Sequence, residues 1–189
     1  MLECDMQRAL KLHPDSRCAA VSRIDVEIAR PHPGRLVLRY LVTGKMGDLR
    51  LPAVTAPARA DALWQHTCFE AFLRASPDAG YYEFNFAPST RWAAYRFSAY
   101  RRGMSVARDV AAPRIEAQAS GERYTLQASV DLDEIPNLPR DAAWRLALSA
   151  VIEETSGGKS YWALAHPPGK PDFHHADGFV YELPVVSSP

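Results

Sequence analysis

The sequence has little of what marks several common classes of protein. Only three of its 189 residues are cysteines, Cys4, Cys18 and Cys68, and their spacing is not that of a zinc knuckle. An odd, scattered set does not indicate a disulfide framework, so we expect reduced thiols. The first residues, MLECDMQRALKLHPDS, contain acidic side chains and no long apolar run, which argues against a secretory signal or a membrane span. We therefore expect a cytoplasmic protein.

Neither sign of charge is in excess. The 22 Lys and Arg residues balance 22 Asp and Glu residues, which gives a formal net charge of zero. Because no overall positive field attracts the chain to a polyanion, we expect neither a nucleic acid nor a membrane surface as its partner.

Long amphipathic helices are also missing, and the dominant hydrophobic period is two. The segment RLVLRYLVTG places Leu36, Leu38 and Tyr40 on one side, as a half-buried strand does. Most of the fifteen prolines fall between such segments and mark loops. About ten strands are expected from this pattern, over residues 21–30, 35–44, 66–74, 81–87, 92–100, 114–119, 123–132, 144–154, 160–165 and 178–183.

Helical segments are expected only as short turns, at residues 6–10, 58–64 and 131–138. Many strands without intervening helices predict an all-β protein built as an antiparallel β-sandwich, of the jelly-roll or immunoglobulin-like type. We expect one domain over residues 1–189, with a short irregular lead over residues 1–20.

The most informative stretch is GYYEFNFAPSTRWAAYRFSAYR, residues 80–101, where polar side chains alternate with aromatic rings. If residues 81–87 form a strand, Tyr82, Phe84 and Phe86 share one face and belong to the core. The opposite face then carries Tyr81, Glu83, Asn85 and Ala87.

The strand expected at residues 66–74 adds a second carboxylate to this face. Only ASPDAG separates the two strands, so they are expected to pair as a hairpin. Registers that oppose Glu70 to Asn85 or to Glu83 gather all three residues on one face. A slip by one residue would turn Glu70 toward the core aromatic rings, which the cost of burying a carboxylate disfavours.

A face with two carboxylates, an amide and nearby indoles has the chemistry of a site for a sugar or related polyol. Carboxylates and amides hold hydroxyl groups, while aromatic faces cover the apolar C–H patches of the sugar ring. Trp64 lies just before these strands and Trp92 just after them. The alternative is an ordinary sheet face, on which arginines satisfy the carboxylates. The arginines in question are Arg91, Arg96, Arg101 and Arg102, and we count Arg96 among the candidate ligand-binding residues.

Three segments resemble the bacterial DOMON-like proteins, which are related to family 9 carbohydrate-binding modules and to haem-binding DOMON domains. The segments are LWQHTCFEAFL, YYEFNFAPSTRWAAYRFSAYRRGM and SYWALAHPPGKPDFHHADGFVYEL. The resemblance covers roughly residues 20–183 and implies a β-sandwich. In the carbohydrate-binding relatives, aromatic residues flank a sugar whose hydroxyls contact polar side chains of the sheet. The positions that match this role are Trp64, Glu70, Glu83, Asn85, Trp92 and Trp162.

The resemblance also raises a haem-binding redox module as an alternative. Axial ligands could come from Met104, Lys159, His166, His174 and His175, although no haem attachment motif is present. We expect neither haem nor another cofactor. A metal ion is not expected either, because the adjacent His174 and His175 would point to opposite sides of an extended segment. A single ion held by His166 and one of these two histidines is the alternative.

A carboxylate-based glycoside hydrolase is the third alternative. Glu70 and Glu83 could form its acid pair, which requires carboxyl groups about 5 to 10 Å apart. The segment SGGKS does not fit a phosphate loop and is expected to be a hairpin turn. We expect a non-catalytic module that binds a small ligand, most simply a sugar, with the proline-rich segment HPPGKPDFHHADG, residues 166–178, covering one end or face of the sandwich.

Overall fold

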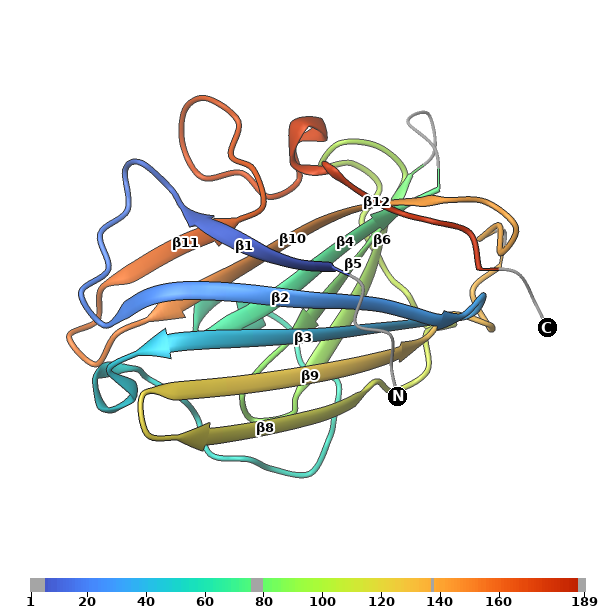
Figure 1. The fold of residues 1–189 in the computed structure, drawn as a ribbon. Helices are drawn as coiled ribbons and strands as arrows, with labels where there is room; N and C mark the ends of the chain where they lie inside the picture. The colour runs from blue at the N-terminus through green and yellow to red at the C-terminus, as the bar shows by residue number, and fades with distance from the viewer. Residues whose placement is uncertain (1–5, 76–79, 137, 187–189) are drawn as a thin grey trace.

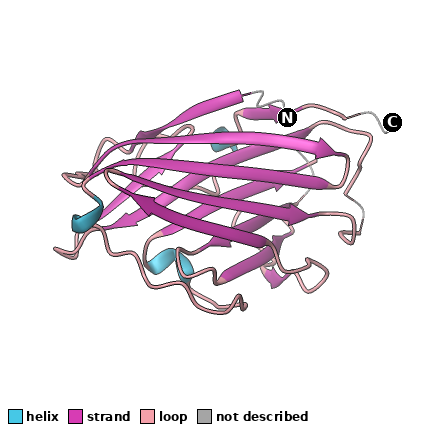
Figure 2. Cartoon of the chain, turned by 60° about the horizontal axis from the view of Figure 1, so that its bottom comes forward, coloured by secondary structure: helices cyan, strands magenta, loops and turns pink. Residues whose placement is uncertain are grey.

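Antiparallel β-strands make up almost all of the regular structure (Figures 1 and 2). The computed structural model describes residues 6–75, 80–136 and 138–186. Within them lie twelve strands: β1 (Met6–Leu12), β2 (Val21–His32), β3 (Arg35–Gly44), β4 (Cys68–Arg74), β5 (Tyr81–Phe86), β6 (Trp92–Phe97), β7 (Ser105–Val106), β8 (Arg114–Ser120), β9 (Arg123–Asp131), β10 (Trp144–Glu153), β11 (Lys159–Ala163) and β12 (Tyr181–Leu183).

The helical elements of the described residues are three short 3-10 turns. They are η1 (Met46–Asp48), η2 (Leu63–Gln65) and η3 (Ala176–Gly178). None of the helices in the described ranges is long and apolar enough to cross a membrane.

The strands form one sheet that folds over into two packed layers. Their order is β7-β6-β5-β4-β10-β11-β1-β2-β3-β9-β8, and β12 extends the sheet by pairing with β10. In Figure 1 the layer of β2, β3, β9 and β8 lies in front of the layer that contains β10, β4, β5 and β6. We call these the front layer and the back layer. The prediction of an all-β antiparallel protein is confirmed.

The core fills the space between the two layers. Ile24, Leu38 and Tyr40 from the front layer pack in the same cluster as Phe69 and Phe84 from the back layer. The Tyr40 hydroxyl donates a hydrogen bond of 2.8 Å to the backbone oxygen of Glu70. The two layers are therefore joined by apolar packing and by a buried polar contact.

The expectation for the N-terminal segment was wrong. Residues 6–12 form β1, not a helical turn within an irregular lead. Met6 to Leu10 pair with β2, and Lys11 and Leu12 pair with β11. Because this strand bridges the front and back layers, its conformation is set by partners far away in the sequence, which overrides a weak local helix preference.

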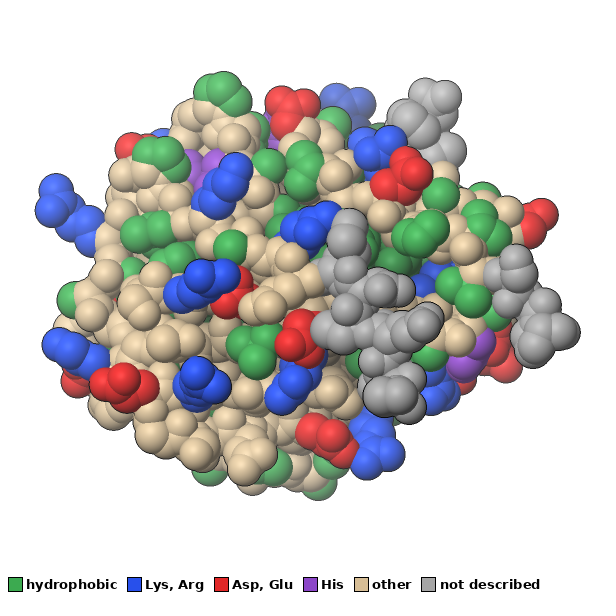
Figure 3. All heavy atoms as spheres, in the orientation of Figure 1, with side chains coloured by type: hydrophobic (Ala, Val, Ile, Leu, Met, Phe, Trp, Pro, Cys, Tyr) green, Lys and Arg blue, Asp and Glu red, His purple; other side chains and the backbone are tan. Residues whose placement is uncertain are grey.

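The outer face of the front layer is an ordinary solvated surface. Figure 3 shows basic and acidic side chains interspersed over it, in keeping with the balanced charge of the chain. Exposed ion pairs such as Arg39 with Glu27, at 3.2 Å, lie on this side. On the outer face of the back layer, by contrast, Glu70 and Glu83 are buried.

Candidate functional site

The outer face of the back layer gathers the polar residues of neighbouring strands. In the register of β4 with β5, Glu70 lies opposite Asn85, and Phe72 lies opposite Glu83. On the other side of β4, Ser149 of β10 lies opposite Glu70. The predicted shared face of Glu70, Glu83 and Asn85 is confirmed, with Tyr82, Phe84 and Phe86 turned away from it. We call Glu70, Glu83, Asn85 and Ser149 the polar cluster.

The polar cluster is almost completely removed from solvent. Glu70 is 3% exposed, Glu83 5% and Asn85 0%. The Asn85 Nδ2 group donates to Glu83 Oε1 at 2.8 Å, and the Ser149 hydroxyl donates to Glu70 Oε2 at 3.5 Å. Glu70 Oε1 and Asn85 Oδ1 find no hydrogen-bond partner among the described residues. Two buried acceptors on directly opposed residues thus lack a donor.

Burial changes the acidity of both carboxyl groups. Loss of water raises the pKa of Glu70 well above its usual value, the nearby Glu83 raises it further, and the Ser149 hydrogen bond offsets part of this rise. Burial also raises the pKa of Glu83, against the opposing effects of the Asn85 hydrogen bond and of Arg101. The pair therefore retains a proton to higher pH than exposed carboxyl groups do.

Aromatic residues surround the polar cluster on one side. Phe72, Tyr81, Tyr95 and Phe97 belong to a second apolar cluster on the outer face, and Leu63 and Phe173 pack against its edge. Tyr81 and Phe97 stack with ring centroids 4.8 Å apart. In the registers of β5, Glu83 lies directly between Phe72 on β4 and Tyr95 on β6.

His174, in the segment before β12, closes over this face. Its ring packs edge-on against Phe72 at 5.0 Å, and its Nδ1 lies 2.9 Å from the Tyr81 hydroxyl. Its Nε2 lies 3.8 Å from Glu83 Oε2. Burial, together with the nearby Arg101, lowers the pKa of His174 to about 4, so the imidazole is neutral at physiological pH.

An ion pair outside the aromatic cluster holds this segment in place. Arg101 contacts Asp172 at 2.8 Å, and the Tyr100 hydroxyl also donates to the Asp172 carboxylate. Phe179, a few residues later, packs against Phe72 and Tyr81. The prediction that residues 166–178 cover a face of the sandwich is confirmed.

Trp64 lies in η2, a turn that packs against β4 and β5, and it is 49% exposed. The turn is fixed by the Tyr95 hydroxyl, which donates to Asp61 at 2.8 Å, and by Ala62, whose φ of 58° bends the chain into η2. Burial raises the pKa of Tyr95 and the Asp61 hydrogen bond raises it further, so this hydroxyl remains a donor.

Three expected site residues do not lie on this face. Trp92 is 4% exposed and sits opposite Phe86 in the core, with the Arg59 guanidinium 4.0 Å from its ring centroid. Trp162 is likewise a core residue. Arg96 lies opposite Tyr82, on the other face from Glu83, and is exposed at the end of β6. Strand alternation assigns positions 92 and 96 to the core-facing side, so the placement of these three residues beside the polar face was wrong.

The alternative in which arginines satisfy the carboxylates is not what the structure shows. Across the described ranges no arginine forms an ion pair with Glu70 or Glu83. Glu83 Oε2 instead lies 3.8 Å from Nε2 of His174, which is neutral. Arg101 acts on Glu83 only through space and is paired with Asp172.

Sequence reasoning missed three residues of this face, one within the polar cluster and two beside it. Tyr95 could have been found by extending the alternation into residues 92–97, which pair with β5. Ser149 required the pairing of β10 with β4, two strands that are far apart in the sequence. His174 lies in an irregular segment, where no periodicity reports the direction of a side chain.

The residues considered for haem or a metal have separate environments. His166 donates to the Lys11 carbonyl at 2.8 Å and packs against His13, while His175 accepts from the backbone of Asp177. Met104 is 63% exposed beside β7. In the part of the chain that the structure describes, no three His, Cys, Asp or Glu side chains are grouped as a metal site requires.

The comparisons with known proteins give fold neighbours only. A candidate carbohydrate-binding protein from Bacteroides uniformis ATCC 8492 aligns with a TM-score of 0.70 and 15% identity over 96% of this chain and 86% of its own. A family 9 carbohydrate-binding module from Caldicellulosiruptor kristjanssonii, in complex with cellotriose, aligns with a TM-score of 0.58 and 10% identity over 97% of this chain and 84% of its own.

A family 9 module from the same organism in complex with glucose has a TM-score of 0.51 and 11% identity, over 95% of this chain and 86% of its own. The sequence matches no model of a protein family. It also matches no curated protein. At these identities the neighbours show that the chain shares their fold.

Proposed function

We propose that this chain is a non-catalytic carbohydrate-binding module whose ligand lies on the outer face of the back layer, over Glu70 and Asn85. The observation that carries the proposal is the pair of buried acceptors without donors, Glu70 Oε1 and Asn85 Oδ1. A buried acceptor without a partner costs about 1 to 3 kcal/mol, and hydroxyl groups of a sugar would supply the missing donors.

The aromatic residues at the border provide the apolar part of such a site. Trp64 presents an indole that is 49% exposed, beside strands β4 and β5. An exposed tryptophan in a turn beside these two strands suits the C–H face of a sugar ring. The fold neighbours that hold cellotriose and glucose support a sugar as the ligand class.

The sequence supports three finer assignments, which we also propose. They are a bacterial DOMON-like relationship, a jelly-roll or immunoglobulin-like strand topology and a cytoplasmic location. We also propose a small molecule as the partner, not nucleic acid, on the balanced charge of the chain. Haem is the second ligand class, and an absorbance band near about 400 nm in the purified protein would support it.

A glycoside hydrolase is the second candidate function, because Glu70 and Glu83 are two buried carboxyl groups on the same face of adjacent strands. Release of sugar from aryl glycosides by the wild type, lost in Glu70→Gln, would favour the hydrolase over the binding module.

Trp64 also supplies the test of binding. Trp92, Trp144 and Trp162 are at most 5% exposed, so a sugar that stacks at the border should change the emission of Trp64 alone. We expect cello-oligosaccharides to change the tryptophan fluorescence of the wild type but not of Trp64→Phe. A broad panel of sugars that leaves both the emission and the melting temperature unchanged would contradict the proposal.

A further inference from the structure

The polar cluster contains two carboxyl groups without a cation in contact. Glu83 has Asn85 as its hydrogen-bond donor, and Glu70 has Ser149. His174 beside Glu83 is neutral, and Arg101 is engaged with Asp172. Because burial of an uncompensated carboxylate is costly, the raised pKa of each carboxyl group lets the pair keep a proton to higher pH than exposed carboxyl groups do.

The cluster is also rich in acceptors and poor in donors. Glu70 Oε1 and Asn85 Oδ1 have no partner among the described residues, and Glu83 Oε2 has only His174 Nε2, at 3.8 Å. A proton held by the carboxyl pair adds only one donor, so acceptors remain in excess. A sugar hydroxyl brings one donor and two acceptor lone pairs, and those lone pairs would face further acceptors. An ammonium group brings three donors and no acceptor, so it matches the cluster better.

The aromatic surroundings favour the same group. Phe72 and Tyr95 lie directly opposite Glu83 on the two neighbouring strands. Aromatic faces attract cations by about 0.5 to 2 kcal/mol, more when water is excluded. A primary ammonium beside two carboxyl groups and two rings would therefore be held by charge, by hydrogen bonds and by cation–π contact.

We propose that the preferred ligand is a cationic amino sugar, whose ammonium group lies between Glu70, Glu83 and Asn85. This assignment rests on the proposed carbohydrate-binding function and names the substrate class of the same site. No covalent bond forms between the ligand and the protein. The ammonium takes the place of the proton of the carboxyl pair: the carboxyl O–H bond breaks, its electron pair stays on the carboxylate, and the proton passes to the buffer.

Other titratable groups face the pair and do not replace the ammonium. Tyr40 and Cys68 lie near Glu70, where burial raises the pKa of the hydroxyl and of the thiol, so both stay neutral. Tyr81 and Tyr95, near Glu83, also have a raised pKa, because burial disfavours their ionised forms. The proton exchanged on binding is therefore that of the carboxyl pair.

The first experiment is calorimetric titration of the wild-type protein at neutral pH with glucosamine, glucose and N-acetylglucosamine, each in two buffers of different ionisation heat. These three sugars differ only in the group at one carbon. We expect glucosamine to bind about tenfold or more tightly than glucose, because charge-assisted hydrogen bonds are stronger. Its apparent binding heat should depend on the buffer, since a proton is released, whereas that of glucose should not.

The outcomes separate the inference from the proposed function. If glucose binds as tightly as glucosamine, or if glucosamine releases no proton, the amino-sugar inference is overturned while carbohydrate binding stands. If none of the three sugars nor their oligomers bind, the proposed function fails and the inference fails with it. Calcium binding that blocks glucosamine would identify a metal site and would also overturn the inference.

Two variants provide a second test of the amino-sugar inference. In Glu83→Gln the advantage of glucosamine over glucose should fall to about threefold or less, because one charge is removed from the pair. The control is Glu116→Gln, in the other layer, where the side chain is 54% exposed and bonded to Arg114; it should keep the full preference. An unchanged preference in a folded Glu83→Gln would contradict the inference, and the two-buffer titration of the wild type tests it without any variant.

Discussion

Glu70 and Glu83 are removed from water by the fold without receiving a cation, and this makes them the residues most sensitive to pH. The folded-state pKa of Glu70 lies well above 4.5, the ordinary value for a glutamate side chain in water. A raised folded-state pKa gives a contribution to stability that is complete below about pH 4.5 and is lost as pH rises through the folded-state value.

The melting temperature of Glu70→Gln should therefore rise relative to that of the wild type as pH increases. The amide cannot ionise, so we expect its melting temperature to approach or exceed that of the wild type at neutral pH and to lose that advantage near pH 4.5. Thermal melts of both proteins across this range measure the difference, at about 2 to 4 °C for each kcal/mol. Parallel curves would show that Glu70 ionises normally.

His174 should make the protein less stable as pH falls, whereas Glu70 makes it less stable as pH rises. Its folded-state pKa is lowered to about 4 from 6.5, so the unfolded chain takes up the proton first as pH falls. The wild type should lose up to about 3 kcal/mol between these two values, relative to a variant without the imidazole. Melts of His174→Phe, whose ring suits the aromatic cluster, should lack this loss, and a constant difference between the two proteins would contradict the assignment.

For single residues, alternation along a strand predicted correctly which polar side chains share the outer face. The aromatic residues expected beside them were not predicted as well. Glu70, Glu83 and Asn85 share a face because each lies on a regular strand whose period is two. Trp92 was placed by its chemistry and not by its parity, which assigns it to the core. Trp64 could be associated with the face only because it lies close in sequence to β4.

Among the elements, the segment before β12 is held over the site by few contacts. Asp172 accepts hydrogen bonds from Arg101, from Tyr100 and from the backbone of His174. We expect Asp172→Asn to increase amide hydrogen exchange over residues 170–178 by about tenfold, since an ion pair and charge-assisted bonds are lost. The exposed Asp177→Asn is the control, and equal exchange in the two variants would show that Asp172 does not hold the segment.

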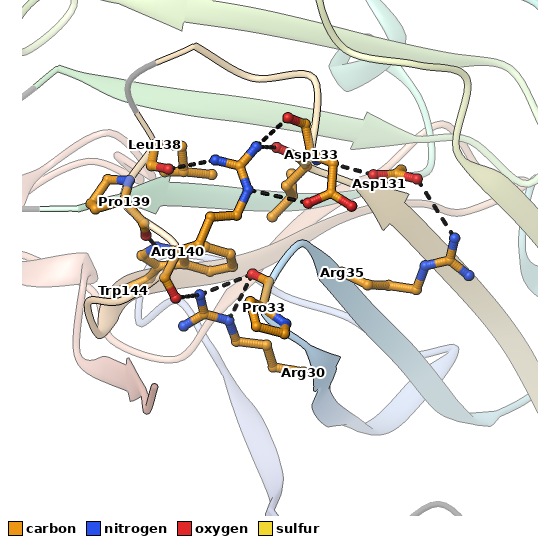
Figure 4. Close-up of polar contacts among 10 residues, drawn as sticks. Arg30, Pro33, Arg35, Asp131, Asp133, Leu138, Pro139, Arg140 and Trp144 are labelled. Atoms are coloured by element: carbon orange, nitrogen blue, oxygen red, sulfur yellow. Dashed lines mark hydrogen bonds and ion pairs between the residues drawn. The ribbon is translucent and has the colours of Figure 1, made fainter. Parts of the chain in front are cut away.

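The opposite end of the sandwich is held by Arg30 of β2 (Figure 4). Its guanidinium donates to the carbonyl oxygens of Pro33, Arg140, Ala142 and Pro184 and lies 3.4 Å from the ring centroid of Trp144. One side chain on β2 thus fixes the loop before β10 and the segment after β12.

Replacement of Arg30 should be costly because several partly buried carbonyl groups lose their donor together. We expect Arg30→Met to lower the free energy of unfolding by about 2 to 4 kcal/mol. Arg39→Met, which removes only an exposed pair with Glu27, should cost about 1 kcal/mol or less. Denaturant unfolding measures both losses. Equal losses of unfolding free energy in the two variants would mean that the Arg30 contacts do not contribute this stability.

Element prediction succeeded where the hydrophobic period is local and failed where pairing is not. The long strands β3 and β9 follow directly from alternation over residues 35–44 and 123–132. β1 has its conformation fixed by β2 and β11, and the two-residue β7 is too short to show a period. The order of strands, which brings Ser149 beside Glu70, is likewise a property of the whole chain.

For the whole molecule, the central claim is that the outer face of the back layer binds a sugar through buried acceptors and an exposed indole. The most direct measurement is a fluorescence titration of the wild type, Trp64→Phe and Asn85→Ala with cello-oligosaccharides and amino sugars.

We expect a saturable change in the wild type and no change in Trp64→Phe. We also expect binding that is weaker by about 1 to 3 kcal/mol in Asn85→Ala, while the melting temperatures show all three proteins folded. A saturable change of the same affinity in the wild type and Asn85→Ala would contradict the account, because the ligand would then lie elsewhere on the molecule.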